Sequence, residues 1–183
     1  LKKLGIKVYW IGTKTGMERK ILKGFDFKLY TINVKGVRKS GALRIIGSPF
    51  LLVFSVCQAI HIILRVNPQV VIGMGGFVSG PVGIAAKLCC RKLVIHEQNA
   101  VAGITNRILS LVANRTLQAF PDTFNGSVKA ITTGNPVRVS ISSIPPPEER
   151  REQKGYVSIL VFGGSRGAGI LNHVIPRAIV DSG

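Results

Sequence analysis

Apolar and polar positions alternate along the chain in two kinds of block. Short runs rich in β-branched and aromatic residues predict strands, whereas longer runs with apolar residues three and four positions apart predict helices. The predicted strands cover residues 6–11, 27–33, 69–73, 92–96, 115–120, 128–132 and 156–162. The predicted helices cover residues 16–23, 42–66, 81–90, 102–113 and 168–180. This alternation predicts an α/β fold with a Rossmann-like parallel sheet covered on both faces, which binds ligands at the carboxyl ends of its strands.

The pattern breaks once, at residues 141–155, where three prolines precede a run of charged residues with little to bury. We interpret this stretch as a linker. It separates a predicted first domain, residues 1–140, from residues 156–183, whose strand, glycine turn and helix form the opening unit of a second domain. The chain also begins without Met and stops inside a predicted helix, so we expect a fragment of a longer protein.

The predicted helix at 42–66 is apolar enough to raise the question of a membrane span. Polar residues such as Ser55, Gln58 and His61 form a narrow stripe along it, which favours a buried or half-buried helix. Four basic residues stand directly before or at its start, namely Lys35, Arg38, Lys39 and Arg44. A basic cluster beside an apolar surface is typical of an interfacial membrane patch, although a solvated loop before a core helix explains it equally well.

The net positive charge of the chain favours an anionic binding partner. Lys and Arg number 25 against 8 Asp and Glu, a net charge of +17, and residues 1–65 hold thirteen basic but only two acidic side chains. Such a field attracts phosphates, nucleic acid or an anionic membrane. No basic and aromatic signature of nucleic-acid binding accompanies it, so a nucleic-acid module remains the weaker alternative. The three cysteines offer neither a disulfide framework nor a zinc-binding spacing, and we expect a reducing compartment, no metal and no cofactor.

A first glycine cluster, Gly73-Met74-Gly75-Gly76-Phe77-Val78-Ser79-Gly80-Pro81, follows a predicted strand. Paired glycines let a ligand approach the backbone, and we expect Ser79 to cap a helix that begins near Pro81. The amino terminus of a helix binds anions, so the cluster is either a phosphate site or a structural turn. It is not a dinucleotide-binding fingerprint, because Val78 occupies the third glycine position.

Two further polar motifs follow predicted strands. His96-Glu97-Gln98-Asn99 places four polar side chains at the ligand-binding edge, where they serve sugar binding or acid–base chemistry, unless they only cap a helix or satisfy buried backbone. In Gly134-Asn135-Pro136-Val137-Arg138, the turn precedes a linker, and the Arg138 guanidinium suits bidentate binding of a diphosphate in a cleft between two domains.

The last glycine cluster, residues 162–169, surrounds Ser165. It is either a phosphate cradle at a helix start or, as Gly163-x-Ser165-x-Gly167, the nucleophile elbow of an α/β-hydrolase. Only His173 and Asp181 follow the serine, in reversed order and close together on one predicted helix, which disfavours the hydrolase alternative.

A fifth motif, Gln118-Ala119-Phe120-Pro121, lies between the second and third of these four. In this order and at compatible spacing, the five motifs resemble the MurG family of bacterial glycosyltransferases, from near residue 1 to residue 183. The resemblance implies a GT-B fold with two Rossmann-like halves. It implies inverting transfer of N-acetylglucosamine from UDP-N-acetylglucosamine to undecaprenyl-diphospho-muramoyl-pentapeptide (lipid I), which gives lipid II for peptidoglycan synthesis. The enzyme would lie peripherally on the cytoplasmic face of the bacterial inner membrane, with that anionic surface as a partner and no nucleic acid.

The resemblance also assigns residues. Asn99, Arg138 and Ser165 match donor-binding positions of the family, and the turn with Gly75, Gly76 and Ser79 matches the loop that faces the acceptor diphosphate. No catalytic residue is assigned, because the family's candidate base belongs to a glycine-rich loop that would precede Leu1. His96, Glu97, Asn106 and Asn172 lie in matching motifs without a role of their own. We therefore expect the fragment itself to be inactive.

Overall fold

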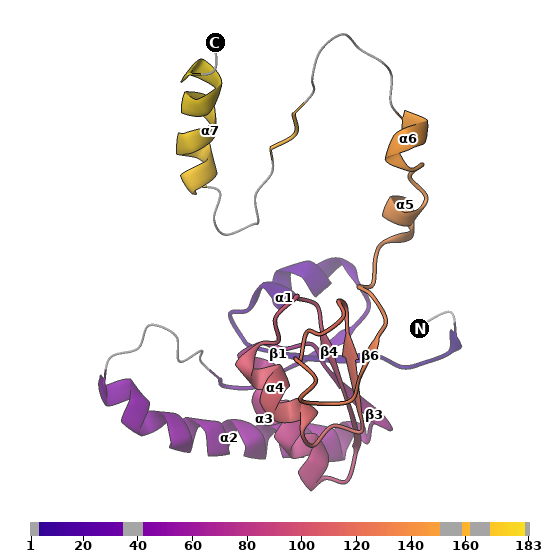
Figure 1. Cartoon of the computed structure of the whole chain (residues 1–183). Coiled ribbons are helices and arrows are strands. Elements are labelled where there is room, and N and C mark those ends of the chain that lie inside the picture. The colour runs from indigo at the N-terminus through magenta and orange to yellow at the C-terminus, as the bar shows by residue number, and fades with distance from the viewer. Residues whose placement is uncertain (1–3, 35–41, 151–158, 162–168, 182–183) are drawn as a thin grey trace. The chain divides into compact units, whose positions relative to one another are not determined.

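A computed structural model describes residues 4–34, 42–150, 159–161 and 169–181 (Figure 1). The chain divides into two compact units, Leu1–Pro136 and Val137–Gly183. The elements of the first unit are β1 (Tyr9–Gly12), α1 (Met17–Ile21), the 3-10 helix η2 (Leu22–Gly24), β2 (Lys28–Thr31), α2 (Ala42–Val66), β3 (Val70–Gly73), α3 (Gly76–Leu88), β4 (Lys92–Glu97), α4 (Ile104–Ser110), β5 (Arg115–Gln118) and β6 (Ala130–Thr132).

All strand pairs of the first unit are parallel. β1 pairs with β2, and a four-stranded sheet has the order β3-β4-β5-β6. Each of these four strands is separated from the next by a helix or a long loop, as a parallel connection requires. The alternating pattern therefore predicted the α/β class correctly, and the carboxyl ends of β3 to β6 meet at one edge of the sheet.

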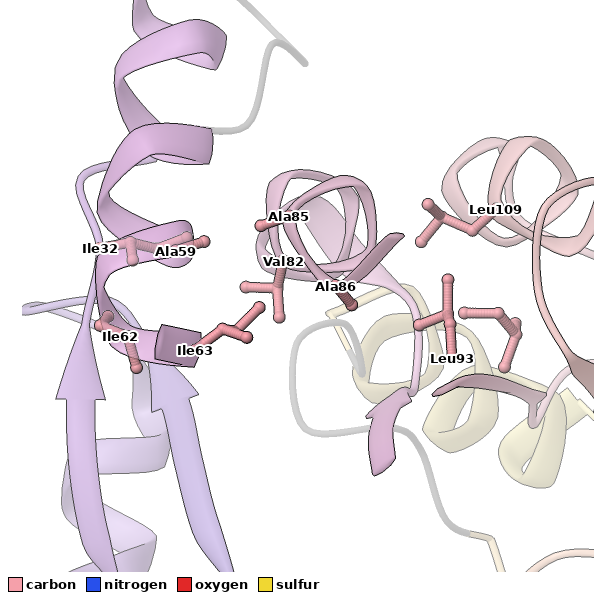
Figure 2. Close-up of a cluster of buried hydrophobic side chains, with 10 residues drawn as sticks. Ile32, Ala59, Ile62, Ile63, Val82, Ala85, Ala86, Leu93 and Leu109 are labelled. Carbon is pink, nitrogen blue, oxygen red and sulfur yellow. The ribbon is translucent and has the colours of Figure 1, made fainter. Parts of the chain in front are cut away.

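The core lies among helices α2, α3 and α4, strand β4 and the residue that follows β2, Ile32 (Figure 2). Its buried apolar side chains are Ile32, Ala59, Ile62, Ile63, Val82, Ala85, Ala86, Leu93, Ile95 and Leu109. Alternate residues of β4 point into this cluster, because successive side chains of a strand face opposite sides. The same alternation carries Glu97, two residues beyond Ile95, onto the covered face at the end of the strand.

The opposite face of the sheet is less enclosed than the sequence pattern predicted. Val70, Ile72 and Ile131 are 45 %, 59 % and 50 % exposed. Coverage of both faces is therefore wrong for the described residues, since the helices that bury Leu93 and Ile95 gather on one side. Nearly continuous apolar strands predicted that both faces of the sheet are buried, but this pattern does not identify the segments that pack on each face.

Helix α2 has the predicted bounds and is half-buried. Its stripe of polar residues fixes it to the segment after β2: the Ser55 hydroxyl donates to the Asn33 carbonyl oxygen at 2.6 Å, and Gln58 Oε1 accepts from the Asn33 amide at 2.7 Å. Among the described helices, none combines the length and the hydropathy needed to cross a bilayer.

The second unit contains α5 (Val139–Ser142), α6 (Pro147–Arg150) and α7 (Gly169–Asp181). Two single-turn helices thus lie in or next to the stretch interpreted as a linker. Helix α7 agrees with the prediction at 168–180. Of the strand predicted at 156–162, the structure describes residues 159–161, which have no regular secondary structure, and the remainder lies outside the described residues.

Close packing of α3 against α4 generates a stability prediction. A Cβ at Gly83 would lie 2.7 Å from Leu109 Cδ2, and Leu109 is buried. We expect Gly83→Ala to destabilise the chain, because overpacking costs about 1–3 kcal/mol and outweighs the helix-propensity gain of about 1 kcal/mol. In the Leu109→Ala background, the same substitution should become stabilising, because the new methyl group enters the cavity. Urea unfolding of the four variants measures this coupling.

Gly80→Ala is the matched control, because a Cβ there meets only Thr105 Cγ2, at an ordinary 3.7 Å. It should have the same effect with and without Leu109→Ala. Equal effects of Gly83→Ala in both backgrounds would contradict the packing described here.

Candidate functional site

The candidate site is the edge of the four-stranded sheet where β3, β4, β5 and β6 end, at Gly73, Glu97, Gln118 and Thr132. The loops after β3, β4 and β6 carry three of the motifs that the sequence singled out. Parallel strands bring these loops to one place, which is where α/β sheets bind ligands.

The loop after β3 is a glycine turn that leads directly into α3. Gly75 and Gly76 have φ angles of +82° and +76°, a region that residues with a Cβ rarely adopt. Helix α3 begins at Gly76, five residues before the predicted start. Gly75 is its N-cap residue and makes no side-chain hydrogen bond. The prediction that Ser79 caps the helix is wrong: Ser79 lies in its first turn, where its hydroxyl donates to the Gly75 carbonyl oxygen at 2.6 Å.

Glu97, at the end of β4, is the centre of a hydrogen-bond network. Its side chain is 2 % exposed. Oε1 accepts from the Asn99 backbone amide at 3.0 Å and from Asn99 Nδ2 at 2.8 Å. Oε2 accepts from the Gly103 amide at 3.1 Å and from Asn106 Nδ2 at 2.8 Å. Burial alone would raise the pKa of Glu97, but these four donors outweigh it and hold the pKa below its ordinary value.

His96 is buried and has both ring nitrogens occupied. Nε2 lies 3.1 Å from the Gly134 carbonyl oxygen, and Nδ1 lies 3.1 Å from Gln98 Nε2. A carbonyl only accepts and an amide nitrogen only donates, so this pairing requires the tautomer with its proton on Nε2. Between the two roles that the sequence left open for the 96–99 motif, His96 and Glu97 therefore satisfy buried groups rather than face a ligand.

The loops after β4 and β6 are held together. Asn135 Nδ2 donates to the Gln98 carbonyl oxygen at 3.2 Å, in addition to the contact between His96 and Gly134. The Thr123 hydroxyl, from the segment between β5 and β6, lies 3.3 Å from the Asn99 carbonyl oxygen and shares its proton between that oxygen and the Phe120 carbonyl oxygen at 2.9 Å. Two motifs that are more than thirty residues apart in the sequence thus form one structure, with Asn99 exposed at its surface.

Asn106 on α4 connects this network to the glycine turn. It is 1 % exposed, and Nδ2 donates to Glu97 and also to the His96 carbonyl oxygen at 3.3 Å. A Cβ on Gly75 would lie 3.2 Å from Asn106 Nδ2, so the side chain packs directly beneath the turn. Its Oδ1 is buried and has no hydrogen-bond partner among the described residues. The sequence placed Asn106 in a motif but carried no signal of its burial.

The structure thus brings Asn99, Gly75, Gly76 and Ser79 to one edge of the first unit. Arg138 belongs to the second unit, where it is exposed and is the residue before the first turn of α5. Ser165 lies outside the described residues.

Comparison with known proteins agrees with this architecture. The N-terminal domain of glycosyltransferase family 28 matches residues 1–118. The chain is 46 % identical over 97 % of its length to the UDP-N-acetylglucosamine--N-acetylmuramyl-(pentapeptide) pyrophosphoryl-undecaprenol N-acetylglucosamine transferase of Mannheimia succiniciproducens, and 44 % identical over 97 % to the protein of that name from Haemophilus ducreyi. It spans about half the length of these relatives, 49 % and 50 %.

A solved structure is similar as well. The crystal structure of Acinetobacter baumannii MurG matches 98 % of this chain with a TM-score of 0.73 and 38 % sequence identity, and the chain covers 48 % of that protein. The family match extends over more than half of the chain and includes the glycine turn, the Glu97 network and Asn106. The chain belongs to glycosyltransferase family 28, and residues 1–118 carry its N-terminal domain.

Proposed function

We propose that the protein takes part in transfer of N-acetylglucosamine from UDP-N-acetylglucosamine to lipid I, which yields lipid II for peptidoglycan synthesis. The observation that carries the proposal is the identity of 46 % and 44 % with relatives that bear this activity in their names, over 97 % of the chain. The site supports it, because exposed polar groups and free helix N–H groups converge at one sheet edge.

We assign the donor and acceptor roles to different loops of that edge. Asn99 meets the sugar nucleotide. The acceptor diphosphate lies against the first N–H groups of α3, at Gly76 and the next two residues, which have no acceptor within the helix. The Ser79 hydroxyl proton is already donated to Gly75, so Ser79 holds the turn in shape rather than donating to the phosphate.

Arg138 and Ser165 complete the proposed donor contacts. A guanidinium stabilises the charge that develops on a departing diphosphate, and backbone amides around Ser165 add to this. In this proposal, residues 1–140 form the acceptor and membrane domain, residues 141–155 the linker and residues 156–183 the start of the UDP-sugar domain. The base that activates the acceptor hydroxyl is neither His96 nor Glu97, whose accepting atoms are occupied.

A chimera in which this chain replaces the matching segment of the M. succiniciproducens relative tests these roles. We expect Asn99→Ala and Arg138→Ala each to lower kcat/KM for UDP-N-acetylglucosamine about tenfold or more, because each removes a hydrogen bond worth about 1–3 kcal/mol. Steady-state kinetics with lipid I as acceptor measures the effect.

Gln69→Ala and Lys92→Ala serve as controls, because both residues are exposed at the opposite end of the strands, where β3 and β4 begin. They should leave kcat/KM unchanged. Wild-type kinetics in both Asn99→Ala and Arg138→Ala would refute the assignment of the donor site.

We further propose that α2 rests on the anionic inner-membrane surface, at its cytoplasmic face. The helix buries Ala59, Ile62 and Ile63 against the core, whereas Phe50, Val53, Phe54 and Leu64 are exposed by 80 %, 62 %, 52 % and 60 %. These four residues recur at helical spacing and form an outer apolar stripe. An exposed apolar surface beside basic residues suits the lipid headgroup region.

Charge adds to this proposal. In the sequence, Lys35, Arg38, Lys39 and Arg44 immediately precede or open α2. Each basic residue near an anionic surface contributes about 1 kcal/mol, an attraction that salt weakens. We therefore expect the chain to sediment with phosphatidylglycerol-containing vesicles and to be released as the salt concentration rises.

The triple substitution Phe50→Ser, Val53→Ser, Phe54→Ser should reduce the vesicle partition coefficient about tenfold or more, because it removes apolar area that would enter the interface. Vesicle sedimentation at fixed salt measures the coefficient.

The matched control is Ile104→Ser, Ile108→Ser, Leu111→Ser on and just after α4, where three apolar residues are exposed to a similar extent. This control should bind vesicles like the unsubstituted chain. Equal losses in both triple variants, or binding that salt does not weaken, would contradict the membrane proposal.

A further inference from the structure

We propose that Glu97 is a positioning residue of the transfer reaction, which orients the Asn99 carboxamide so that its oxygen faces outward toward the donor sugar. The inference rests on the proposed function, in which Asn99 meets the sugar nucleotide. It assigns a role to a buried carboxylate that neither contacts solvent nor reaches a ligand itself.

The first step is the saturation of the carboxylate. Each oxygen of Glu97 accepts two hydrogen bonds, all between 2.8 and 3.1 Å, and the side chain is 2 % exposed. A general base needs an accessible lone pair within reach of the proton that it removes. Glu97 has no such lone pair, so its charge serves the groups around it.

The second step concerns the direction of the Asn99 amide. Both the Asn99 backbone N–H and Nδ2 donate to Glu97 Oε1, at 3.0 and 2.8 Å. A carboxylate only accepts, so the reversed amide would set two oxygens against each other. Glu97 therefore fixes Nδ2 inward and Oδ1 outward on an exposed side chain. An outward amide oxygen accepts a hydrogen bond from a sugar hydroxyl or acetamido N–H and disfavours a phosphate oxygen.

The third step is the anchoring of Glu97 itself. Its other oxygen is held by the Gly103 amide and by Asn106 Nδ2, which also packs beneath Gly75. Asn106 is buried and is tied to the His96 carbonyl oxygen as well. The carboxylate thus cannot rotate without breaking contacts on α4 and under the glycine turn. The orientation of Asn99 and the support of the turn depend on the same group.

Glu97→Gln isolates this role, because it keeps the size of the side chain and removes its charge. The new amide has one oxygen and one nitrogen, while all four surrounding partners are N–H donors. One pair of donors must therefore face an N–H group. Where that pair is on Asn99, reversal of the Asn99 side-chain amide relieves the conflict at Nδ2 and turns an N–H group outward, while the backbone N–H loses its acceptor.

The test is a double-mutant cycle in the chimera with the M. succiniciproducens relative. We expect Glu97→Gln and Asn99→Ala each to raise KM for UDP-N-acetylglucosamine about tenfold, and the double variant to differ from Asn99→Ala by about twofold or less. We also expect any fall of kcat/KM at acidic pH that the unsubstituted chimera shows to persist in Glu97→Gln, because a positioning residue does not take up the reacting proton. Glu18→Gln is the control, since Glu18 also accepts hydrogen bonds, from Thr13, but lies in the first turn of α1.

Two kinetic results would overturn the inference. Independent, multiplying effects of the two substitutions would show that Glu97 does not act through Asn99. Loss of the acidic limb together with a fall in kcat would make Glu97 a catalytic base. A wild-type chimera that folds but transfers no sugar would instead count against the proposed function.

A second measurement decides the inference without any activity. In nitrogen-15 NMR spectra of the chain, the Asn99 side-chain amide protons should exchange slowly in the wild type and at least about tenfold faster in Glu97→Gln, because the charged acceptor is lost. Unchanged exchange in Glu97→Gln would overturn the inference even where the chimera is inactive.

Discussion

The candidate site depends on one buried negative charge. Glu97 lies on the covered face of the sheet, where an unpaired carboxylate would cost several kcal/mol, and four N–H donors from three residues satisfy it. Since each donor belongs to a residue near the edge of the sheet, satisfying the charge also fixes the loop after β4 and the start of α4. Strand β4 therefore contributes to both the apolar core and the polar edge, because Leu93, Ile95 and Glu97 lie on the same face of the sheet.

The same network also supports the glycine turn that follows β3. The glycine turn after β3 leads into α3 without a side-chain cap, which leaves the first N–H groups of the helix open to a ligand. Asn106 supports the turn from below and binds Glu97 at the same time. On another part of the unit, α2 divides its surface between a core face and an exposed apolar stripe. One domain thus presents exposed polar groups at the edge of its sheet, which we propose meet a sugar nucleotide and a diphosphate, and an exposed apolar stripe on α2, which we propose meets a membrane.

The sequence predicted those features that depend on periodicity. The α/β class, the parallel strands and the bounds of α2 follow from the alternation of apolar blocks, and the structure confirms them. It did not predict the start of α3, because two consecutive glycines with positive φ can begin a helix where a serine cap was expected. Nor did it distinguish buried from exposed members of the 96–99 motif, since some partners of His96 and Glu97 lie outside the motif, at residues 103, 106 and 134. The binding roles of Asn99, Arg138, Ser165 and the glycine turn stay predictions.

The charge state of Glu97 is the most direct test of this account. Titration of its side-chain carboxyl carbon by carbon-13 NMR should give a midpoint below the ordinary glutamate pKa, and the Asn99 and Gly103 amide signals should shift with the same midpoint. Because the folded-state pKa is lowered, its contribution to stability should be present above the unfolded value and be lost as the pH falls through that midpoint. A midpoint at or above the ordinary value, or amide signals that do not follow it, would contradict the account.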